Sequence, residues 1–227
     1  MRAGAILVDF DGTACRHDVA EHLLRRFADP SWEDLDRAWE RGEADSRGVI
    51  SQQSAMLREP VDVLIAYARA HCPIDPTLGP FVEWARSLGV PVTIVSDGFG
   101  FYIEPLLEAA GIDGVRVITN AWRDGEITFP NGHELCIGCG TCKMRAVVEA
   151  RGADGPVAFV GEGMSDRYGA LYADVTFAKD VLVDICRRDG VPSVPWNDFD
   201  DVRRHLESTA DLPGPLAPVR CPGWQLP

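Results

Sequence analysis

Positive charge is scarce in this 227-residue chain, which has 22 Lys and Arg against 35 Asp and Glu and a formal net charge of −13. A groove for nucleic acid needs clustered Lys and Arg, so this balance argues against a nucleic-acid partner. Long apolar runs are also missing: no stretch approaches the roughly 20 residues of a membrane span, and the N-terminal run is too short for a secretion signal. We therefore expect a cytoplasmic protein that binds neither nucleic acid nor a membrane.

An even set of cysteines is lacking as well. The chain has seven, without a signal peptide, which favours free thiols in a reducing compartment over a disulfide framework. The length allows one large core, or a core with a small insert. The sequence gives no indication of the oligomeric state.

Strand patterns alternate with helix patterns over most of the chain, as in a doubly wound parallel sheet with helices on both faces. The apolar run "AILVDF" predicts a first strand buried on both faces. Further strands are predicted in "VPVTIVS", "PVAFVG" and "DVTFA", and "VRVITNAWRDGEITFP" predicts two strands around an Asp124–Gly125 turn. The predicted fold class is therefore α/β, with a Rossmann-like core.

Residues 16–75 carry only helix patterns. The first helix is predicted to begin after Asp18, an N-cap residue with Glu21 three positions on. We expect 16–75 to form an all-helical cap, inserted after the first strand of a core made of residues 1–15 and 76–210. The tail, 211–227, is rich in Pro and has no periodicity, so it is predicted to be disordered or laid along the surface.

Polar side chains stand at the ends of several predicted strands or at the start of a helix. Ligands of open parallel sheets bind at the carboxyl ends of the strands, so we expect these side chains to converge although they are far apart in the chain. They are, in chain order, Asp9 and Asp11, Ser96, Lys143, and Glu162 and Asp166.

This set of side chains suits phosphoryl transfer. A carboxylate can attack phosphorus and form an aspartyl phosphate, while a second carboxyl protonates the leaving oxygen. Asp9, Glu162 and Asp166 would repel one another unless a cation sat among them, and their hard oxygens suit Mg²⁺. Lys143 would add positive charge near the phosphoryl group. Ser96 and the backbone amides around Gly12 and Gly98 could donate hydrogen bonds to its oxygens.

Each feature also has an ordinary structural explanation. "DFDGT" could be a turn whose carboxylates cap a helix, and Ser96 could be a hydroxyl that merely ends a strand. Lys143 could be a solvated helix residue, and Glu162 and Asp166 could be acids at a helix start. Their combined occurrence at matching strand ends favours the catalytic interpretation.

Four motifs in this order, "DFDGT", "IVSDG", "CK" at 142–143 and "GEGMSD", resemble those of the haloacid dehalogenase superfamily of aspartyl-phosphate hydrolases. The resemblance extends to about residue 208, and the helical insert resembles the small cap of the phosphoserine-phosphatase branch. "VSDGFGFYIEPLL", the cysteine-containing segment before Lys143 and "ADVTFAKDVLVDICR" are most similar to the methionine-salvage phosphatases, which act on a phosphorylated five-carbon methylthio sugar derivative.

The resemblance implies a role for each site residue. Asp9 would be the nucleophile and Asp11 the acid/base. The implied phosphate-binding residues are Ser96, Asp97, Gly98 and Lys143. The implied Mg²⁺ ligands are Asp9, the main-chain carbonyl of Asp11, Glu162 and Asp166.

Two residues depart from the family's usual pattern. Glu162 replaces a commoner Asp and reaches one methylene further, and Asp97 stands where phosphoserine phosphatases usually have Gly, which argues against phosphoserine as substrate. Asp11 favours phosphomonoester hydrolysis, since a dehalogenase has no leaving oxygen to protonate. The predicted function is a Mg²⁺-dependent phosphatase for a small phosphorylated metabolite, such as a phosphopentose-derived sugar or a nucleoside-like phosphate.

Two alternatives remain open on the sequence. A phosphotransferase or mutase would pass the same aspartyl phosphate to a hydroxyl group. A non-catalytic zinc-binding module would use the segment "HELCIGCGTCK", whose possible ligands are His133, Cys136, Cys139 and Cys142, although packed free thiols are the preferred interpretation.

Residues near the predicted cap are also candidates. Arg16 and His17 follow the first motif and should stand at the cap entrance, where they are either substrate-binding residues or a solvated hinge. Trp32 and Trp39, seven positions apart, are predicted to belong to the core of the cap.

Overall fold

The computed structural model describes residues 3–123, 126–136, 138–209, 214 and 221. The predicted Asp124–Gly125 turn and nearly all of the Pro-rich tail lie outside these residues. Within them, six strands form one parallel sheet in the order β3-β2-β1-β6-β7-β8. The strands are β1 (Ala5–Val8), β2 (Val92–Val95), β3 (Arg116–Ile118), β6 (Val157–Gly161), β7 (Val175–Ala178) and β8 (Ser193–Pro195).

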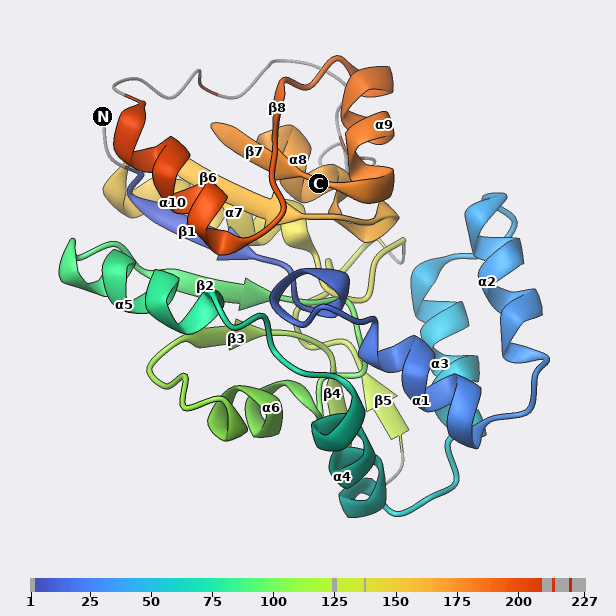
Figure 1. The fold of residues 1–227 in the computed structure, drawn as a ribbon. Coiled ribbons are helices and arrows are strands. Elements are labelled where there is room, and N and C mark those ends of the chain that lie inside the picture. The colour runs from blue at the N-terminus through green and yellow to red at the C-terminus, as the bar shows by residue number, and fades with distance from the viewer. Residues whose placement is uncertain (1–2, 124–125, 137, 210–213, 215–220, 222–227) are drawn as a thin grey trace.

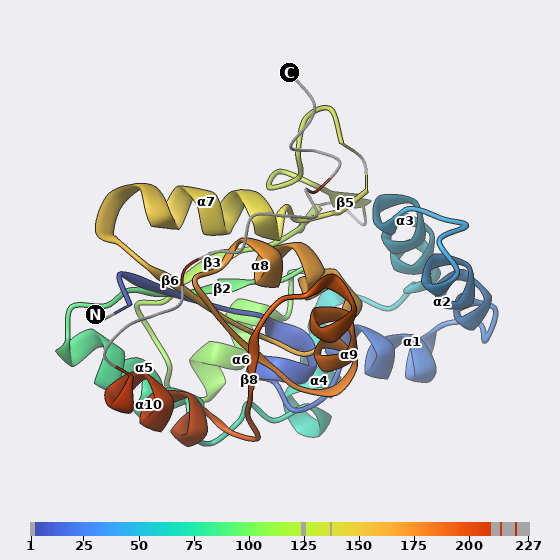
Figure 2. The same ribbon diagram turned by 90° about the horizontal axis from the view of Figure 1, so that it is seen from above.

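Helices cover both faces of this sheet (Figure 2), which confirms the predicted doubly wound fold. One face carries α7 (Lys143–Asp154), α8 (Arg167–Tyr172) and α9 (Asp180–Asp189). The other carries α5 (Leu78–Ser87), α6 (Ile103–Ala109) and α10 (Phe199–Ser208).

Alternation along the central strand divides the core into two layers. Ala5 and Leu7 of β1 pack with the residues under α7, α8 and α9. Ile6 and Val8 point to the opposite face and pack with those of α5, α6 and α10. All four residues are buried, because a parallel strand with helices on both sides has no solvent-facing row. The apolar run that predicted this strand therefore reflects burial on two faces.

The four helices between β1 and α5 are α1 (Val19–Phe27), α2 (Trp32–Glu40), α3 (Ser46–Met56) and α4 (Val61–His71). We call them the cap helices. In both ribbon views α1, α2 and α3 lie beyond one end of the sheet (Figures 1 and 2). The Asp18 side chain accepts a hydrogen bond from the Glu21 backbone N–H at 2.8 Å, so the predicted N-cap of α1 is confirmed.

The chain leaves the sheet and returns to it through two adjacent linkers. Cys15 and Ile74 form an isolated antiparallel bridge, close to the predicted cap boundaries at 16 and 75. Arg16 donates to the Asp75 carboxylate at 2.9 Å and so ties the two linkers together. The division into core and cap at these boundaries stays a prediction, which this bridge supports.

Two parts of the sheet differ from the sequence prediction. The segment predicted to hold two strands holds three short ones: β3 joins the main sheet, while β4 (Ala121–Arg123) and β5 (Glu126–Thr128) form a separate antiparallel hairpin. The edge strand β8 is only three residues long and ends in Pro195, so it gave no strand signal in the sequence. Among the described helices, none combines the length and apolar character needed to cross a membrane.

Candidate active site

The three central strands of the sheet end at the candidate site. β1 lies between β2 and β6, so the residues that follow these strands meet at one edge of the sheet. Ion pairs and hydrogen bonds link several of these residues directly. The sequence-distant side chains brought together here are Asp9, Asp11, Ser96, Asp97, Lys143, Glu162 and Asp166.

A tight turn over Phe10–Ala14 presents the first two aspartates. Gly12 has a φ of 71°, a left-handed conformation that side chains disfavour. A Cβ placed on Gly12 would lie 2.8 Å from Cδ of Glu162, so the turn also needs the absence of a side chain for this close approach. The glycine of the first motif is therefore required by backbone conformation and by packing.

Lys143 joins the first and last motifs. Its Nζ donates to Asp9 Oδ1 at 2.6 Å and to Asp166 Oδ1 at 2.7 Å, and it lies 3.1 Å from Ser165 Oγ. The side chains of Lys143, Asp9 and Asp166 are only 1%, 6% and 0% exposed. Burial acts to lower the pKa of Lys143, but Asp166 and Asp9 more than offset it and hold that pKa above its usual range. Lys143 is therefore a fixed cation behind the proposed nucleophile.

Asp9 is poised between two protonation states. Burial and the neighbouring Asp166 raise its pKa to about 7, against the opposing effect of Lys143. The Asp166 carboxylate uses Oδ2 to accept the backbone N–H groups of Glu162 and Gly163, at 2.8 and 3.0 Å. Both oxygens of Asp166 are thus engaged by the protein, so Asp166 fixes Lys143 and the turn after β6.

Asp11 is held by groups from three other segments. The Tyr102 hydroxyl lies 3.0 and 2.9 Å from Oδ1 and Oδ2, the Val19 backbone N–H donates to Oδ1 at 3.0 Å, and Ser96 Oγ lies 3.3 Å from Oδ2. Burial, with Asp18 and Asp9 nearby, raises the pKa of Asp11 well above the usual range of a carboxyl. This shift favours the protonated form of Asp11, which is the form that a general acid needs.

The turn after β2 is fixed by hydrogen bonds to its side chains and backbone. Ser96 Oγ accepts the Gly98 N–H at 3.0 Å, and the Asp97 carboxylate accepts the Thr141 N–H at 2.6 Å. Asn120, at the end of β3, donates to the Asp97 and Gly98 carbonyls at 2.9 and 2.8 Å. A Cβ on Gly98 would overlap the Tyr102 hydroxyl and lie 2.5 Å from Asp11 Oδ2, so only Gly fits beside the acid.

Glu162 is the most exposed member of the acidic group at the end of β6. Burial, Asp9 and Asp166 raise its pKa to about 8. Such a shift is expected for a partly buried carboxyl close to other carboxylates, because Lys143 pairs with Asp9 and Asp166 but not with Glu162. A divalent cation would lower these pKa values, so the electrostatics favour one.

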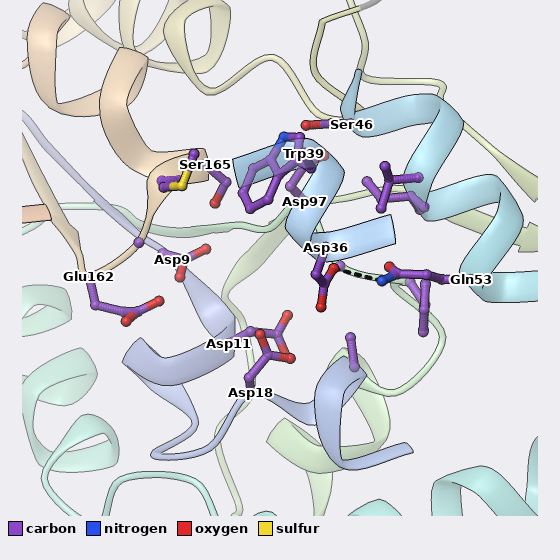
Figure 3. A pocket seen from close by; sticks show the side chains of 17 residues that line it. Asp9, Asp11, Asp18, Asp36, Trp39, Ser46, Gln53, Asp97, Glu162 and Ser165 are labelled. Atoms are coloured by element: carbon purple, nitrogen blue, oxygen red, sulfur yellow. Dashed lines mark hydrogen bonds between the residues drawn. The ribbon is translucent and has the colours of Figure 1, made fainter. Parts of the chain in front are cut away.

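A cavity of about 200 Å³ opens above these residues, between the core and the cap helices. Figure 3 shows Asp9, Glu162 and Ser165 on its core side and Asp36 and Gln53 on its cap side. Trp39 lines it as well, which corrects the prediction that this residue packs in the core of the cap; Trp32 is buried as predicted. The prediction for Trp39 was wrong because a side chain that faces the cavity between the core and the cap helices has the same helical spacing as one that faces a core.

Arg16 and His17 do not line the cavity. Arg16 is paired with Asp75, and the His17 ring packs against His22 at a centroid distance of 4.9 Å. Both side chains are exposed at the linker between core and cap. The structure therefore gives no support to their predicted contact with substrate, although nothing here tests that role directly.

The cysteine segment precedes Lys143 and contacts the cap. His133 Nδ1 accepts the backbone N–H groups of Leu135 and Cys136, both at 3.2 Å, so this nitrogen is already engaged. In the described ranges, no three or more His, Cys, Asp or Glu side chains are placed as a ready-made metal site. The zinc alternative gains no support from this arrangement.

Several site residues carried no signal in the sequence. Tyr102 follows the second motif on a predicted helix, and Asn120 lies at the end of a short strand, so neither stood out from ordinary structural residues. Asp36 and Gln53 sit on amphipathic helices whose polar faces could equally be solvated. Their role depends on what faces them, which a single helix pattern does not report.

The fold agrees with the comparisons to known proteins. Residues 6–170 match the haloacid dehalogenase-like hydrolase family, and the chain belongs to it. The predicted family membership and the predicted class of enzyme, a hydrolase of phosphomonoesters, are confirmed.

Individual relatives carry more specific names. The chain is 31% identical over 213 residues to a 2-hydroxy-3-keto-5-methylthiopentenyl-1-phosphate phosphatase of Geobacillus thermodenitrificans, covering 89% of this chain and 94% of that one. It is 29% identical over 218 residues to a bifunctional enzyme MtnB/MtnX of Bacillus licheniformis, covering 93% of this chain but only 51% of the relative. The fold matches a phospho-aspartyl intermediate analogue of phosphoserine phosphatase with a TM-score of 0.68 at 14% identity, covering 90% and 99% of the two chains.

Proposed function

We propose that this protein is a Mg²⁺-dependent phosphatase that hydrolyses a small, phosphopentose-derived metabolite through an aspartyl phosphate on Asp9. The observation that carries the proposal is the pairing of two carboxyls with different environments beside one cavity. Asp9 is held by the buried Lys143 cation, whereas the Asp11 carboxyl lies in a buried pocket with Tyr102, where burial favours its protonated form. A nucleophile and a general acid need this difference.

The reaction divides into two steps. In the first, a carboxylate oxygen of Asp9 attacks phosphorus while Asp11 gives its proton to the leaving oxygen, which departs as an alcohol. In the second, a water molecule attacks the phosphorus of the aspartyl phosphate, and Asp11, now ionised, takes up the water's proton. Inorganic phosphate leaves, and both carboxyls return to their starting states. Lys143 stays charged throughout and offsets negative charge on Asp9.

The donor set fits Mg²⁺ by its chemistry. Mg²⁺ usually binds through one or two carboxylates and keeps several waters, so a ready-made group of three side chains is not required. Asp9 and Glu162 both line the cavity, and their raised pKa values reflect unbalanced negative charge. Asp9, Glu162 and the main-chain carbonyl of Asp11 would hold the ion. Asp166 lies behind them and would contribute through its negative charge. When bound, Mg²⁺ would supply further positive charge for the phosphoryl group.

The substrate class in this proposal is supported by the relatives. Several are named for hydrolysis of a methylthiopentenyl phosphate, whose chain of five carbons is a small leaving group. A cavity of about 200 Å³ suits a metabolite of that size. These relatives are named as phosphatases, so hydrolysis is preferred over the transferase or mutase alternative.

Removing divalent cations should make the stability of the protein fall as pH rises. Asp9 and Glu162 have pKa values of about 7 and 8 in the folded protein, against ordinary values of 3.8 and 4.5 for these carboxyls in water. The folded state therefore binds more protons than the unfolded state between about pH 4 and 8, and the free energy of unfolding decreases across that window. Thermal unfolding in EDTA at about pH 5, 6, 7 and 8 measures this change in stability.

Mg²⁺ added at the upper end of this range should restore much of the lost stability. A Glu162→Gln variant serves as the matched comparison, because it removes one of the titrating carboxyls and should make the slope shallower. A stability that does not change with pH in EDTA would contradict the assignment of these carboxylates as an unbalanced cation site.

Replacing Asp11 with Asn should trap the aspartyl phosphate. With p-nitrophenyl phosphate the leaving group needs little protonation, so the first step can proceed, whereas the second lacks its base. We expect a burst of one nitrophenol per chain, a mass increase of one phosphoryl group, and steady turnover slowed by about 10²–10⁴-fold. Rapid-mixing absorbance and mass spectrometry of the quenched protein measure the two effects.

Asp113→Asn is a suitable control, since that side chain is 94% exposed and distant in sequence from all four motifs. It should hydrolyse the ester at the rate of the unmodified protein, without an adduct. If Asp11→Asn turns over at that rate as well, Asp11 is not the acid/base and the proposed mechanism is wrong.

A further inference from the structure

The cap side of the cavity is built from α2 and α3. Asp36 and Trp39 come from α2, and Ser46, Ile50 and Gln53 from α3. Figure 3 shows Asp36 and Gln53 facing the catalytic aspartates across the cavity. A leaving group attached to a phosphate at Asp9 must extend towards these side chains, so their chemistry selects the substrate.

Gln53 has a fixed orientation. Its Nε2 donates to Asp36 Oδ1 at 2.7 Å and lies 3.5 Å from the Trp32 carbonyl, so α2 engages the amino end of the amide. The residue is 6% exposed. Among the described residues no donor reaches its Oε1, so this buried amide leaves one acceptor towards the cavity.

Ser46 offers a second unmatched group. The residue is 6% exposed and lines the cavity, and no hydrogen bond to its hydroxyl is found within the described part of the chain. Its backbone N–H is used by the Gly138 carbonyl at 3.4 Å, which fixes the start of α3. This hydroxyl is therefore available to exchange hydrogen bonds with a ligand in the cavity.

The charge of the cavity lining is entirely negative. Six of its side chains are acidic, and among the described residues that line it none is Lys, Arg or His. Lys143 does not line the cavity. It lies behind Asp9, and its ammonium group is paired with the carboxylates of Asp9 and Asp166. A cation such as Mg²⁺ at Asp9 and Glu162 would offset the negative charge of the phosphate. The cap end of the cavity, near Asp36, would still have no positive charge.

We infer that the cap end of the cavity, formed by Asp36, Ser46 and Gln53, binds a leaving group that donates hydrogen bonds and carries no anionic group. This inference rests on the proposed phosphatase function and narrows its substrate class. The Gln53 and Asp36 oxygens accept donors from a hydroxyl or ammonium group, and Ser46 completes its own hydrogen bonds there. A carboxylate in the same place would face Asp36 with no counter-charge, which costs several kcal/mol in comparable like-charge contacts.

Matched phosphate esters test this inference. Glycerol phosphate and the phosphoglycerate phosphorylated on its primary hydroxyl share a three-carbon skeleton, and differ only in a terminal hydroxymethyl or carboxylate group. We expect kcat/KM for glycerol phosphate to exceed that for phosphoglycerate by about 100-fold or more. Propanediol phosphate, which ends in a methyl group, should fall below glycerol phosphate. Inhibition constants against p-nitrophenyl phosphate give the same order where turnover is slow.

An ethanolamine phosphate arm distinguishes the two possible donors. A higher kcat/KM for it than for glycerol phosphate assigns the site to an ammonium group, and a lower one assigns it to hydroxyls. Either result supports the inference, provided that both esters exceed propanediol phosphate. Equal rates for glycerol and propanediol phosphates would overturn it, because the terminal hydroxyl group, the donor farthest from the phosphate, would then not be recognised by the cap end.

Two variants test the residues themselves. Gln53→Arg places a cation at the cap end and should shift the preference towards phosphoglycerate by at least tenfold, about 1.4 kcal/mol. Asp36→Asn removes the repelling charge with little change of shape and should narrow the same ratio, which keeps the test informative if the Arg variant fails to fold. Glu40→Gln, an exposed position at the end of α2, should retain the original ratio.

The outcomes separate this inference from the proposed function. If the unmodified protein hydrolyses phosphoglycerate as well as glycerol phosphate, the cap inference is wrong while the phosphatase assignment stands. If it releases phosphate from none of these esters, nor from p-nitrophenyl phosphate with Mg²⁺, the proposed function and this inference are both overturned.

Discussion

Replacing Asp9 with Asn should reduce phosphate release from p-nitrophenyl phosphate by about four orders of magnitude or more, because an amide cannot replace the attacking carboxylate. Asn has nearly the same shape and can still accept a hydrogen bond from Lys143, which lies 2.6 Å from Asp9 Oδ1. The fold should therefore persist. Phosphate release with Mg²⁺, compared at equal concentrations of folded protein, measures the loss.

The thermal stability of Asp9→Asn gives an independent check. The pKa of Asp9 is raised to about 7, so its ionised form is less favourable in the folded protein than in water. At pH about 8 without divalent cations, the variant should unfold at the same temperature as the unmodified protein or higher. A variant that keeps its activity would refute the nucleophile assignment. If the variant loses activity only because it unfolds, its thermal unfolding midpoint should be much lower than that of the unmodified protein.

Replacing Lys143 with Met should be the most damaging single change for stability and should also reduce activity. It leaves Asp9 and Asp166 buried together without their shared cation, and removing one partner of a buried ion pair costs about 3–5 kcal/mol. Catalysis should fall by about 10²–10³-fold in the protein that remains folded, as for loss of one electrostatic donor. Urea unfolding and single-turnover rates measure the two effects separately.

The stability loss of Lys143→Met should depend on pH. Without the cation the pKa of Asp9 loses the lowering effect of Lys143, so the folded variant can relieve the unpaired charge by binding a proton at low pH. The loss in free energy of unfolding relative to the unmodified protein should therefore be smaller at about pH 5 than at about pH 8.

Lys143→Arg provides the matched control, because it keeps the charge but replaces a compact ammonium group with a wide planar one. It should recover part of the stability and less of the activity. If Lys143→Met is as stable as the unmodified protein at every pH, the ion pairs with Asp9 and Asp166 do not form as described.

The parts of this protein that were predictable share a physical cause. Strands β1, β2 and β6 are buried on both faces, so each leaves a continuous apolar run that ends abruptly at a polar residue. Because these three strands are neighbours, the residues after them had to meet. The Asp18 cap of α1 was equally local, since the helix start depends on residues three positions apart.

What sequence reasoning missed depends on contacts between distant segments. Tyr102 becomes a partner of Asp11 only because α6 packs beneath the first turn, 91 positions away in the chain. Trp39 and Asp36 face a cavity that exists only once α2 stands over the sheet. The edge strand β8 was missed for a local reason, because three residues ending in Pro have little strand character.

One contact outside the reaction centre joins a cap helix to the segment that precedes Lys143. Arg47, beside Ser46 at the start of α3, donates to the carbonyls of His133 and Cys139 at 2.8 and 2.9 Å. Those carbonyls belong to the segment that runs directly into Lys143. Arg47 therefore ties the start of α3, which lines the cap side of the cavity, to the segment that leads into Lys143, so a displacement of α3 would have to break these two hydrogen bonds or move that segment with it.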